Sequence, residues 1–232
     1  MPDAPRPCDP HLDIVGFKYP LPNLAQSLRN QRKVKVVAIG SSSTAGEGNI
    51  VPYASRLEMA LRGRFHGRMI DVLNRGVGGQ EAMDELSRFD PDVIEEAPAL
   101  VIWQVGTNAV FRLGQYSFDD VAVAIAAGLD RIRNLPMDVV LMDLQYTTAI
   151  VGPDKIKAAE DMVSLISTAA ENAKVNVFRR FALMRRWVED NIPIAELVDP
   201  TDPDKLHMSD WAANCVTQAL DGAIKGAPQP IA

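Results

Sequence analysis

The sequence is poor in the two residue types that most often build metal sites and disulfide scaffolds. It has two cysteines, Cys8 and Cys215, and three histidines, His11, His66 and His207, among 232 residues. The cysteines form no C-x-x-C pair and the histidines are scattered, so we expect no bound metal. A bridge between the cysteines would tie the N-terminal arm to the last expected helix, and it would form only in an oxidising compartment.

Long apolar runs and an excess of positive charge are absent as well. No apolar stretch reaches the ~18 residues of a membrane-spanning helix, so we expect no integral membrane segment. The net charge of −6 disfavours nucleic acid as a partner. Met1 leads into a Pro-rich polar segment with no visible signal peptide. This fits a cytoplasmic protein, or a periplasmic or secreted one whose leader has been removed, and nothing in the sequence indicates an oligomeric state.

The composition is that of a single globular domain. The chain is 47% hydrophobic and 23% charged, and its 232 residues are enough to bury a sizeable core. Residues 1–32 contain six prolines, and we expect them to form an irregular arm over the surface that ends in a short helix at 24–29. Residues 33–226 should form the core of the domain.

Short apolar runs alternate along the chain with stretches of helical periodicity. The expected strands are 34–39, 69–73, 99–105, 138–142 and 175–178, and the expected helices are 53–65, 80–88, 119–132, 155–173, 181–190 and 209–224. This alternation predicts an α/β fold with a five-stranded parallel sheet covered by helices on both faces. We expect the strand order 2-1-3-4-5, with every loop that follows a strand at one edge and a crevice between the first and third strands.

A run of small residues, Gly40-Ser41-Ser42-Ser43-Thr44-Ala45-Gly46, follows the first expected strand. By themselves these serines are typical of a turn or a helix cap. The run is not a phosphate loop, because Glu47 follows it where lysine is required, and Thr44 breaks the G-x-S-x-G pattern of a nucleophile elbow. A serine held in such a turn becomes a nucleophile when other loops supply a base and donors for an oxyanion.

A base is available in the polar loop before the last expected helix. His207 lies three residues after Asp204, a spacing at which the carboxylate can reach Nδ1–H and leave Nε2 free to accept the serine proton. Asp202 is the alternative partner for the ring, at a less suitable offset. Together with Asp199, these aspartates lack the glycine and the bidentate glutamate of a calcium loop, so we expect no metal there.

Three groups near the same sheet edge are candidate oxyanion donors. They are the backbone N–H of Gly79 after the second strand, the side-chain amide of Asn108 after the third, and the N–H of Ser42 itself. Gln145 and Tyr146 follow the fourth strand at this edge, and we consider them candidates for a substrate wall.

Four blocks in this order resemble those of the SGNH (GDSL-like) esterases and lipases. They are Gly40-Ser41-Ser42-Ser43-Thr44, Asn74-Arg75-Gly76-Val77-Gly78-Gly79, Gly106-Thr107-Asn108 and Asp204-Lys205-Leu206-His207. The resemblance implies that Ser42 is the nucleophile, that Gly79 and Asn108 line the oxyanion hole, and that Asp204 and His207 complete the triad. It also implies a flavodoxin-like three-layer α/β/α fold, hydrolysis of esters through an acyl-serine, and no cofactor.

One residue departs from the family pattern, because Ser41 stands where members usually have aspartate. The resemblance implies as substrate a small-molecule or glycan ester with a short acyl or O-acetyl group. A carbohydrate O-acetyl esterase or acyltransferase is the alternative that uses the same residues. A retired domain that binds a glycan or a protein is the alternative of another class, and the presence of Ser42, Asn108 and His207 argues against it.

Overall fold

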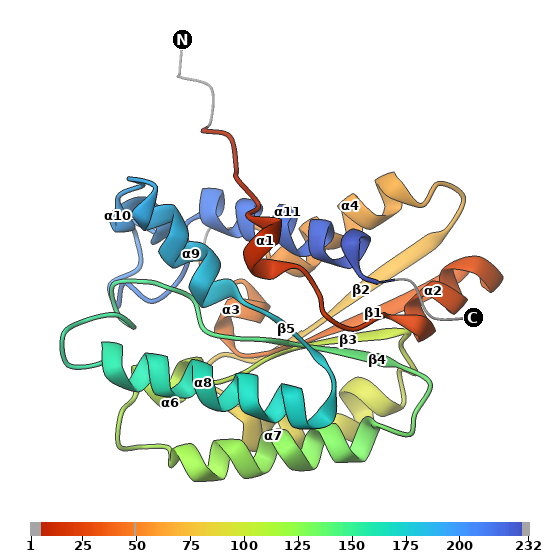
Figure 1. Cartoon of the computed structure of the whole chain (residues 1–232), viewed down its shortest axis with the longest axis horizontal. Coiled ribbons are helices and arrows are strands. Elements are labelled where there is room, and N and C mark those ends of the chain that lie inside the picture. The colour runs from red at the N-terminus through yellow and green to blue at the C-terminus, as the bar shows by residue number, and fades with distance from the viewer. Residues whose placement is uncertain (1–5, 49, 229–232) are drawn as a thin grey trace.

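The computed structural model describes residues 6–48 and 50–228, which form three layers around a parallel sheet (Figure 1). The order β2-β1-β3-β4-β5 confirms the predicted α/β topology. β1 pairs with both β2 and β3, so it lies inside the sheet, and the loop that follows it opens at the sheet's carboxyl edge. The strands are β1 Lys33–Gly40, β2 Met69–Gly76, β3 Leu100–Gln104, β4 Asp138–Met142 and β5 Asn176–Phe178.

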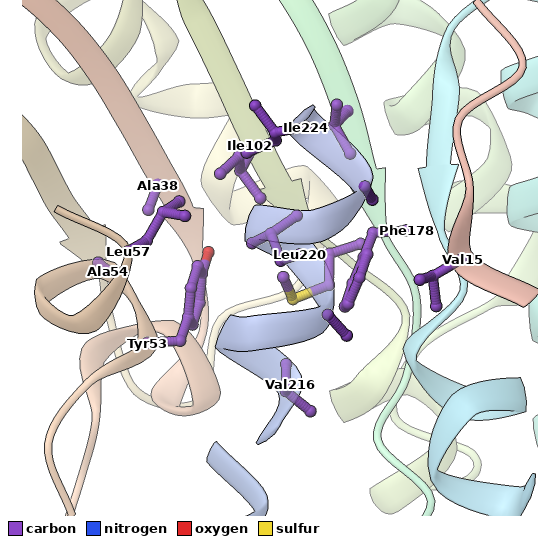
Figure 2. Close-up of a cluster of buried hydrophobic side chains, with 14 of the residues drawn as sticks. Val15, Ala38, Tyr53, Ala54, Leu57, Ile102, Phe178, Val216, Leu220 and Ile224 are labelled. Atoms are coloured by element: carbon purple, nitrogen blue, oxygen red, sulfur yellow. The ribbon is translucent and has the colours of Figure 1, made fainter. Parts of the chain in front are cut away.

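Each central strand is apolar on both sides because helices cover both faces of the sheet. In β1, Val36 and Ala38 belong to one hydrophobic cluster, and Val37 and Ile39 belong to the other. This alternation follows from the two-residue period of a strand. Figure 2 shows the first cluster, in which α11 side chains such as Leu220 lie against the sheet.

The longer helices divide between the two faces. The first cluster takes most of its helical side chains from α2, α4, α9 and α11, and the second takes most of them from α5, α6, α7 and α8. Figure 1 shows α4, α9 and α11 on one side of the sheet and α7 and α8 on the other. No helix among the described residues is both long and apolar enough to cross a bilayer. The helices are α1 Leu12–Val15, α2 Pro22–Asn30, α3 Ser42–Ala45, α4 Tyr53–Arg64, α5 Ala82–Ser87, α6 Thr107–Phe111, α7 Phe118–Ile132, α8 Ile156–Ala173, α9 Arg180–Glu189, α10 Ile194–Leu197 and α11 Asp210–Gly226, with a π-helix η1 at Asp90–Ile94.

The N-terminal arm ends in the expected short helix, α2, but the segment before it is not an irregular surface stretch. It also forms α1, and the side chains Val15, Phe17, Leu21 and Leu24 of the arm are buried in the first cluster. Pro22 begins α2, a position where the missing N–H and the fixed φ of proline suit a helix. The prolines therefore divide the arm into short pieces, while the apolar residues between them add to the core.

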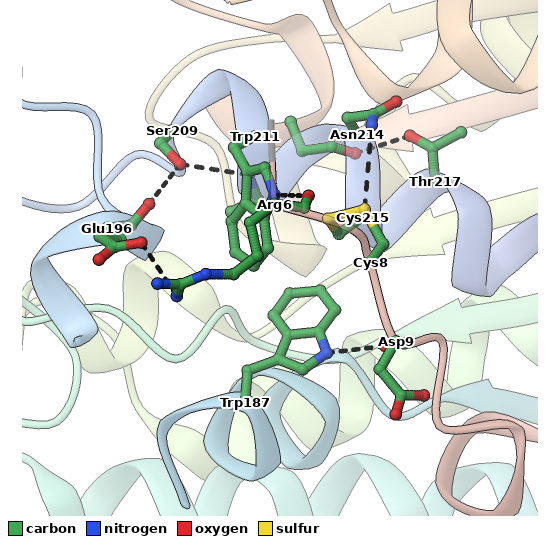
Figure 3. Close-up of a disulfide and its surroundings, with 12 residues drawn as sticks. Arg6, Cys8, Asp9, Trp187, Glu196, Ser209, Trp211, Asn214, Cys215 and Thr217 are labelled. Atoms are coloured by element: carbon green, nitrogen blue, oxygen red, sulfur yellow. Dashed lines mark hydrogen bonds and ion pairs between the residues drawn. A yellow bond between two sulfur atoms is a disulfide. The ribbon is translucent and has the colours of Figure 1, made fainter. Parts of the chain in front are cut away.

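A disulfide between Cys8 and Cys215 joins the arm to α11, and it is the bridge expected for an oxidising compartment (Figure 3). Two indole groups reinforce this attachment. Trp187 Nε1 donates to the carbonyl of Asp9 at 2.8 Å, and Trp211 Nε1 donates to the carbonyl of Arg6 at 2.9 Å. The arm is thus held by one covalent bond and by hydrogen bonds from two helices.

Removing this disulfide should lower the free energy of unfolding by about 2–5 kcal/mol, because the bridge closes a loop of 207 residues in the unfolded chain. The measurement is urea denaturation of the oxidised protein, of the reduced protein and of a Cys8→Ser/Cys215→Ser double variant. The last two should share one lowered midpoint. A midpoint that is identical with and without reductant would contradict the bridge.

Candidate active site

The serine turn lies between β1 and the first turn of α3. Ser41 is the N-cap of α3 and Ser42 is its first residue, and Gly46 ends the helix in a left-handed conformation. The Oγ atom of Ser42 lies 3.0 Å from Nε2 of His207, although 165 residues separate them in sequence. The Ser42 side chain is only 6% exposed, so its hydroxyl is oriented rather than free in solvent. The structure therefore brings together the serine and the histidine that the sequence singled out.

The carboxylate that holds the ring is Asp202, and the expectation of Asp204 is wrong. His207 Nδ1 lies 3.0 Å from Oδ2 of Asp202, and the same oxygen accepts the N–H groups of Leu206 and His207 at 2.8 and 2.7 Å. Asp202 is buried, whereas Asp204 is exposed. The reason is the turn at Lys205, whose φ of 55° reverses the chain and brings the fifth residue before His207, not the third, against the ring.

Asp202 is held in its ionised form. Burial by itself would raise the pKa of this carboxyl group, but the backbone N–H groups of His207, Asp204 and Leu206 outweigh it, and the pKa of Asp202 is lowered from its ordinary value. An ionised carboxylate at Nδ1 fixes the tautomer in which Nε2 of His207 is unprotonated and able to accept a proton.

Gln104, a buried amide at the end of β3, accepts hydrogen bonds from the residues of the serine turn. Its Oε1 accepts the N–H and the hydroxyl of Ser41, both at 3.0 Å, and the hydroxyl of Thr44 at 3.2 Å. Ser41 is therefore fixed in the turn by neutral hydrogen bonds. In the sequence, Gln104 stands out only as a polar residue at the end of an otherwise apolar strand, and a structural role is the ordinary interpretation of such a residue.

Gln145 does not line a substrate wall, which corrects that expectation. Its side chain is fully buried: Oε1 accepts the hydroxyl of Ser43 at 3.0 Å and Nε2 donates to the carbonyl of Leu206 at 3.2 Å. Gln145 thus links the serine turn to the histidine loop from inside. Tyr146 is half-buried and packs edge-on against Phe181, with 5.0 Å between the ring centroids.

The three expected oxyanion donors lie on neighbouring loops at the carboxyl edge of the sheet. The N–H of Ser42 is in the first turn of α3, where helical N–H groups have no intrahelical acceptor. Gly79 has a φ of +78°, which favours glycine. The Nδ2 atom of Asn108 donates to the carbonyl of Gln80 at 2.8 Å, which orients the amide and leaves its second N–H available.

A negative side chain lies beside the serine–histidine pair, and a positive one lies beside Gly79. Oε2 of Glu47 lies 4.0 Å from Nε2 of His207, and a Cβ on Gly78 would lie 2.0 Å from the other oxygen of Glu47. A Cβ on Gly79 would lie 3.3 Å from the guanidinium group of Arg112. Arg112 forms no ion pair with another described residue. Glu47 is therefore next to the histidine, and Arg112 is next to one of the expected oxyanion donors. No cluster of metal-ligating side chains occurs within residues 6–48 and 50–228.

Glu85 carries a fully buried carboxyl group on α5, the helix that follows the loop after β2. Trp103 Nε1 donates to its Oε2 at 2.7 Å, and a Coulombic interaction with Glu81 adds to the effect of burial. Burial first, and the charge of Glu81 second, raise the pKa of Glu85 well above its ordinary value. Glu85 therefore binds a proton in the folded chain at pH values where the unfolded chain has lost it.

Glu85→Gln should stabilise the protein relative to wild type, and more at pH 8 than at pH 5. The free energy of unfolding of the wild type falls as pH rises above about 4.3, the ordinary pKa of a glutamate side chain. The reason is that Glu85 keeps its proton in the folded state after the unfolded state has lost it. Glutamine carries no titrating proton and retains an oxygen for the Trp103 N–H. Urea denaturation of both proteins at the two pH values measures the difference. An equal difference at both would contradict the raised pKa.

Comparisons with known proteins show the family and the fold of the chain. A family model described as the Non-GDSL lipase-like family matches residues 7–229. The structure is similar to Axe2, an acetylxylan esterase from Geobacillus stearothermophilus, with a TM-score of 0.70 and 18% identity over 82% of this chain and 94% of that one. It is also similar to LAE5, an α/β hydrolase enzyme from the metagenome of Lake Arreo, with a TM-score of 0.70 and 19% identity over 84% of this chain and 97% of that one. These likenesses establish the SGNH-type fold.

A curated relative covers less of the chain. The uncharacterized lipoprotein YqeF of Bacillus subtilis (strain 168) is 36% identical over 76 residues, which are 32% of this chain and 31% of that protein. The match thus spans about a third of the relative's length.

The spacing of the mutated residues in Axe2 differs from the spacing of the hydrogen-bonded pair in this chain. Solved catalytic mutants of Axe2 replace a serine, an aspartate and a histidine, and the last two are three positions apart. Asp204 has that spacing from His207, whereas the hydrogen bonds of this chain select Asp202.

Proposed function

The chain belongs to the Non-GDSL lipase-like family, and we propose that it is a serine ester hydrolase that acts through an acyl-serine intermediate. The observation that carries this proposal is the continuous chain of hydrogen bonds from Ser42 Oγ through His207 to Asp202, with a distance of 3.0 Å at each step. Such a chain is what a serine needs to become a nucleophile at neutral pH.

The reaction follows from the positions of these groups. Ser42 Oγ attacks the ester carbonyl while His207 Nε2 accepts its proton, and Asp202 stabilises the imidazolium that forms. The N–H groups of Ser42 and Gly79 and the amide of Asn108 donate to the oxyanion. His207 returns the proton to the leaving alcohol, and water activated by the same ring hydrolyses the acyl-serine.

We propose a short acyl group, with acetyl esters of carbohydrates as the second candidate. The similarity to an acetylxylan esterase supports the second candidate, because that protein's named substrate is an acetylated glycan. A domain that has lost catalysis and only binds a glycan or a protein is disfavoured by the paired serine and histidine.

Two measurements test the proposal. Initial rates with p-nitrophenyl acetate, butyrate and octanoate and with acetylated xylo-oligosaccharides rank the substrate classes, and EDTA should leave these rates unchanged. A fluorophosphonate probe should label Ser42, with the modified peptide identified by mass spectrometry. Absence of both hydrolysis and labelling would refute the proposal, and a loss of activity in EDTA that a divalent ion restores would refute the metal-free mechanism.

Asn108→Ala should lower kcat by roughly 10²–10³-fold, the loss typical of removing one oxyanion donor. Steady-state kinetics with p-nitrophenyl acetate measures this loss. Asn172→Ala is the matched control, because Asn172 is an exposed residue of α8 at the other end of the fold, and its kcat should equal that of wild type. A normal kcat in Asn108→Ala would remove this amide from the mechanism.

A further inference from the structure

The carboxylate of Glu81 is buried against the loop that carries Asn108. Its side chain is 1% exposed, and glutamate is rarely buried to this degree without a partner. No lysine or arginine among the described residues pairs with it. Instead, Oε1 accepts the N–H groups of Gly106 at 2.7 Å and Ala82 at 3.0 Å, and Oε2 accepts the N–H of Ala109 at 2.9 Å.

These contacts fix the backbone on both sides of Asn108. Gly106 is the N-cap of α6 and Ala109 is its third residue, so the two carboxylate oxygens grip the first turn of the helix around Asn108. The preceding residue acts on the side chain, since the carbonyl of Gln80 accepts Nδ2 of Asn108 at 2.8 Å. One dipeptide therefore holds both the backbone and the amide of Asn108.

The same dipeptide directly follows Gly79. Gly79 and Asn108 belong to loops after β2 and β3, which lie on either side of β1 in the sheet. Their relative position is set by whatever joins the two loops, and Gln80 and Glu81 make that connection. Only a carboxylate suits it, because an amide in place of Glu81 would point a donor at one of the backbone N–H groups.

We propose that Glu81 is a positioning residue for the oxyanion hole, which clamps the start of α6 so that Asn108 and Gly79 converge on one oxygen. This inference rests on the proposed function, and it adds a residue that touches neither the substrate nor the Ser42–His207–Asp202 chain. Glu81 acts by positioning Asn108, so its replacement should lower kcat and leave KM nearly unchanged, because the oxyanion contact is made in the transition state.

A double-mutant cycle between Glu81→Gln and Asn108→Ala tests the proposal. Glu81→Gln should lower the kcat for p-nitrophenyl acetate by about 10–100-fold with KM changed less than about threefold, because oxyanion contacts are made in the transition state. The double variant should be no slower than Asn108→Ala alone, since both changes disable one donor. Losses that multiply, or a Glu81→Gln variant with normal kcat, would overturn the proposal.

The control is Glu85→Gln, one turn further along α5. Glu85 is also a buried carboxyl group, but its hydrogen bond goes to Trp103 and not to α6. Its kcat should stay within about twofold of wild type, which separates positioning from a general effect of replacing a buried carboxyl group by an amide. An equal loss in Glu85→Gln would assign the effect of Glu81 to packing.

A second readout does not depend on catalysis. In Glu81→Gln and Glu81→Ala, amide hydrogen exchange at Gly106 and Ala109 should accelerate about tenfold or more, as expected when hydrogen bonds to a charged group are lost. Should Glu81→Ala fail to fold, Glu81→Gln decides, because it preserves the shape of the side chain. Unchanged amide hydrogen exchange at Gly106 and Ala109 would overturn the proposal that Glu81 holds the start of α6. Absence of esterase activity in the wild type with the exchange result intact would refute the proposed function alone.

Discussion

Ser42→Ala should abolish ester hydrolysis, while Ser41→Ala and Ser43→Ala keep measurable activity. Losing the nucleophile of a serine hydrolase costs roughly 10⁴–10⁶-fold in kcat. Of the three adjacent hydroxyls, the one on Ser42 lies 3.0 Å from His207 Nε2. The hydroxyl of Ser41 donates to Gln104 and that of Ser43 donates to Gln145, so both belong to the support of the turn.

The three alanine variants are compared with p-nitrophenyl acetate at equal protein concentration, after circular dichroism has shown that each is folded. A fluorophosphonate probe should label the Ser41 and Ser43 variants but not Ser42→Ala. Equal losses in all three variants would mean that the serines serve the turn and not the chemistry.

Asp202→Asn should lower kcat/KM by about 10⁴-fold, the loss seen when the carboxylate of a serine–histidine triad becomes an amide. The amide cannot stabilise the imidazolium, and it favours the tautomer of His207 in which Nε2 carries the proton. Asp204→Asn should stay within a few-fold of wild type, because Asp204 is exposed and makes no hydrogen bond to the ring.

This pair of variants decides between two aspartates that the sequence alone cannot separate. The substitutions are chemically identical and two residues apart, so each serves as the control for the other. Steady-state kinetics with p-nitrophenyl acetate measures both. A large loss in Asp204→Asn with a normal Asp202→Asn would restore the D-x-x-H assignment and would show that the loop rearranges when substrate binds.

Sequence by itself determined the layers, the strand order and the place of the site. Apolar runs of strand length recur between helical stretches, and this pattern is visible in the sequence because it depends only on local hydrophobic periodicity. The serine run was identifiable as a candidate because polar loops after parallel strands meet at one edge of the sheet. The choice of Ser42 within that run came from the resemblance to the SGNH esterases, which also supported the choice of His207 before the last helix. The last helix was likewise expected, and the hydroxyl of its N-cap residue, Ser209, accepts the N–H of Ala212.

Tertiary structure decided which residues support that site. Whether Asp202 or Asp204 faces His207 depends on a reversal of the chain at Lys205, and a left-handed φ at lysine has no sequence signature. The burial of Gln145 and Glu81 depends on which backbone groups from distant loops are left without partners. A buried polar side chain is stable only where backbone groups form hydrogen bonds with it. These hydrogen bonds form only after the sheet has brought the loops together.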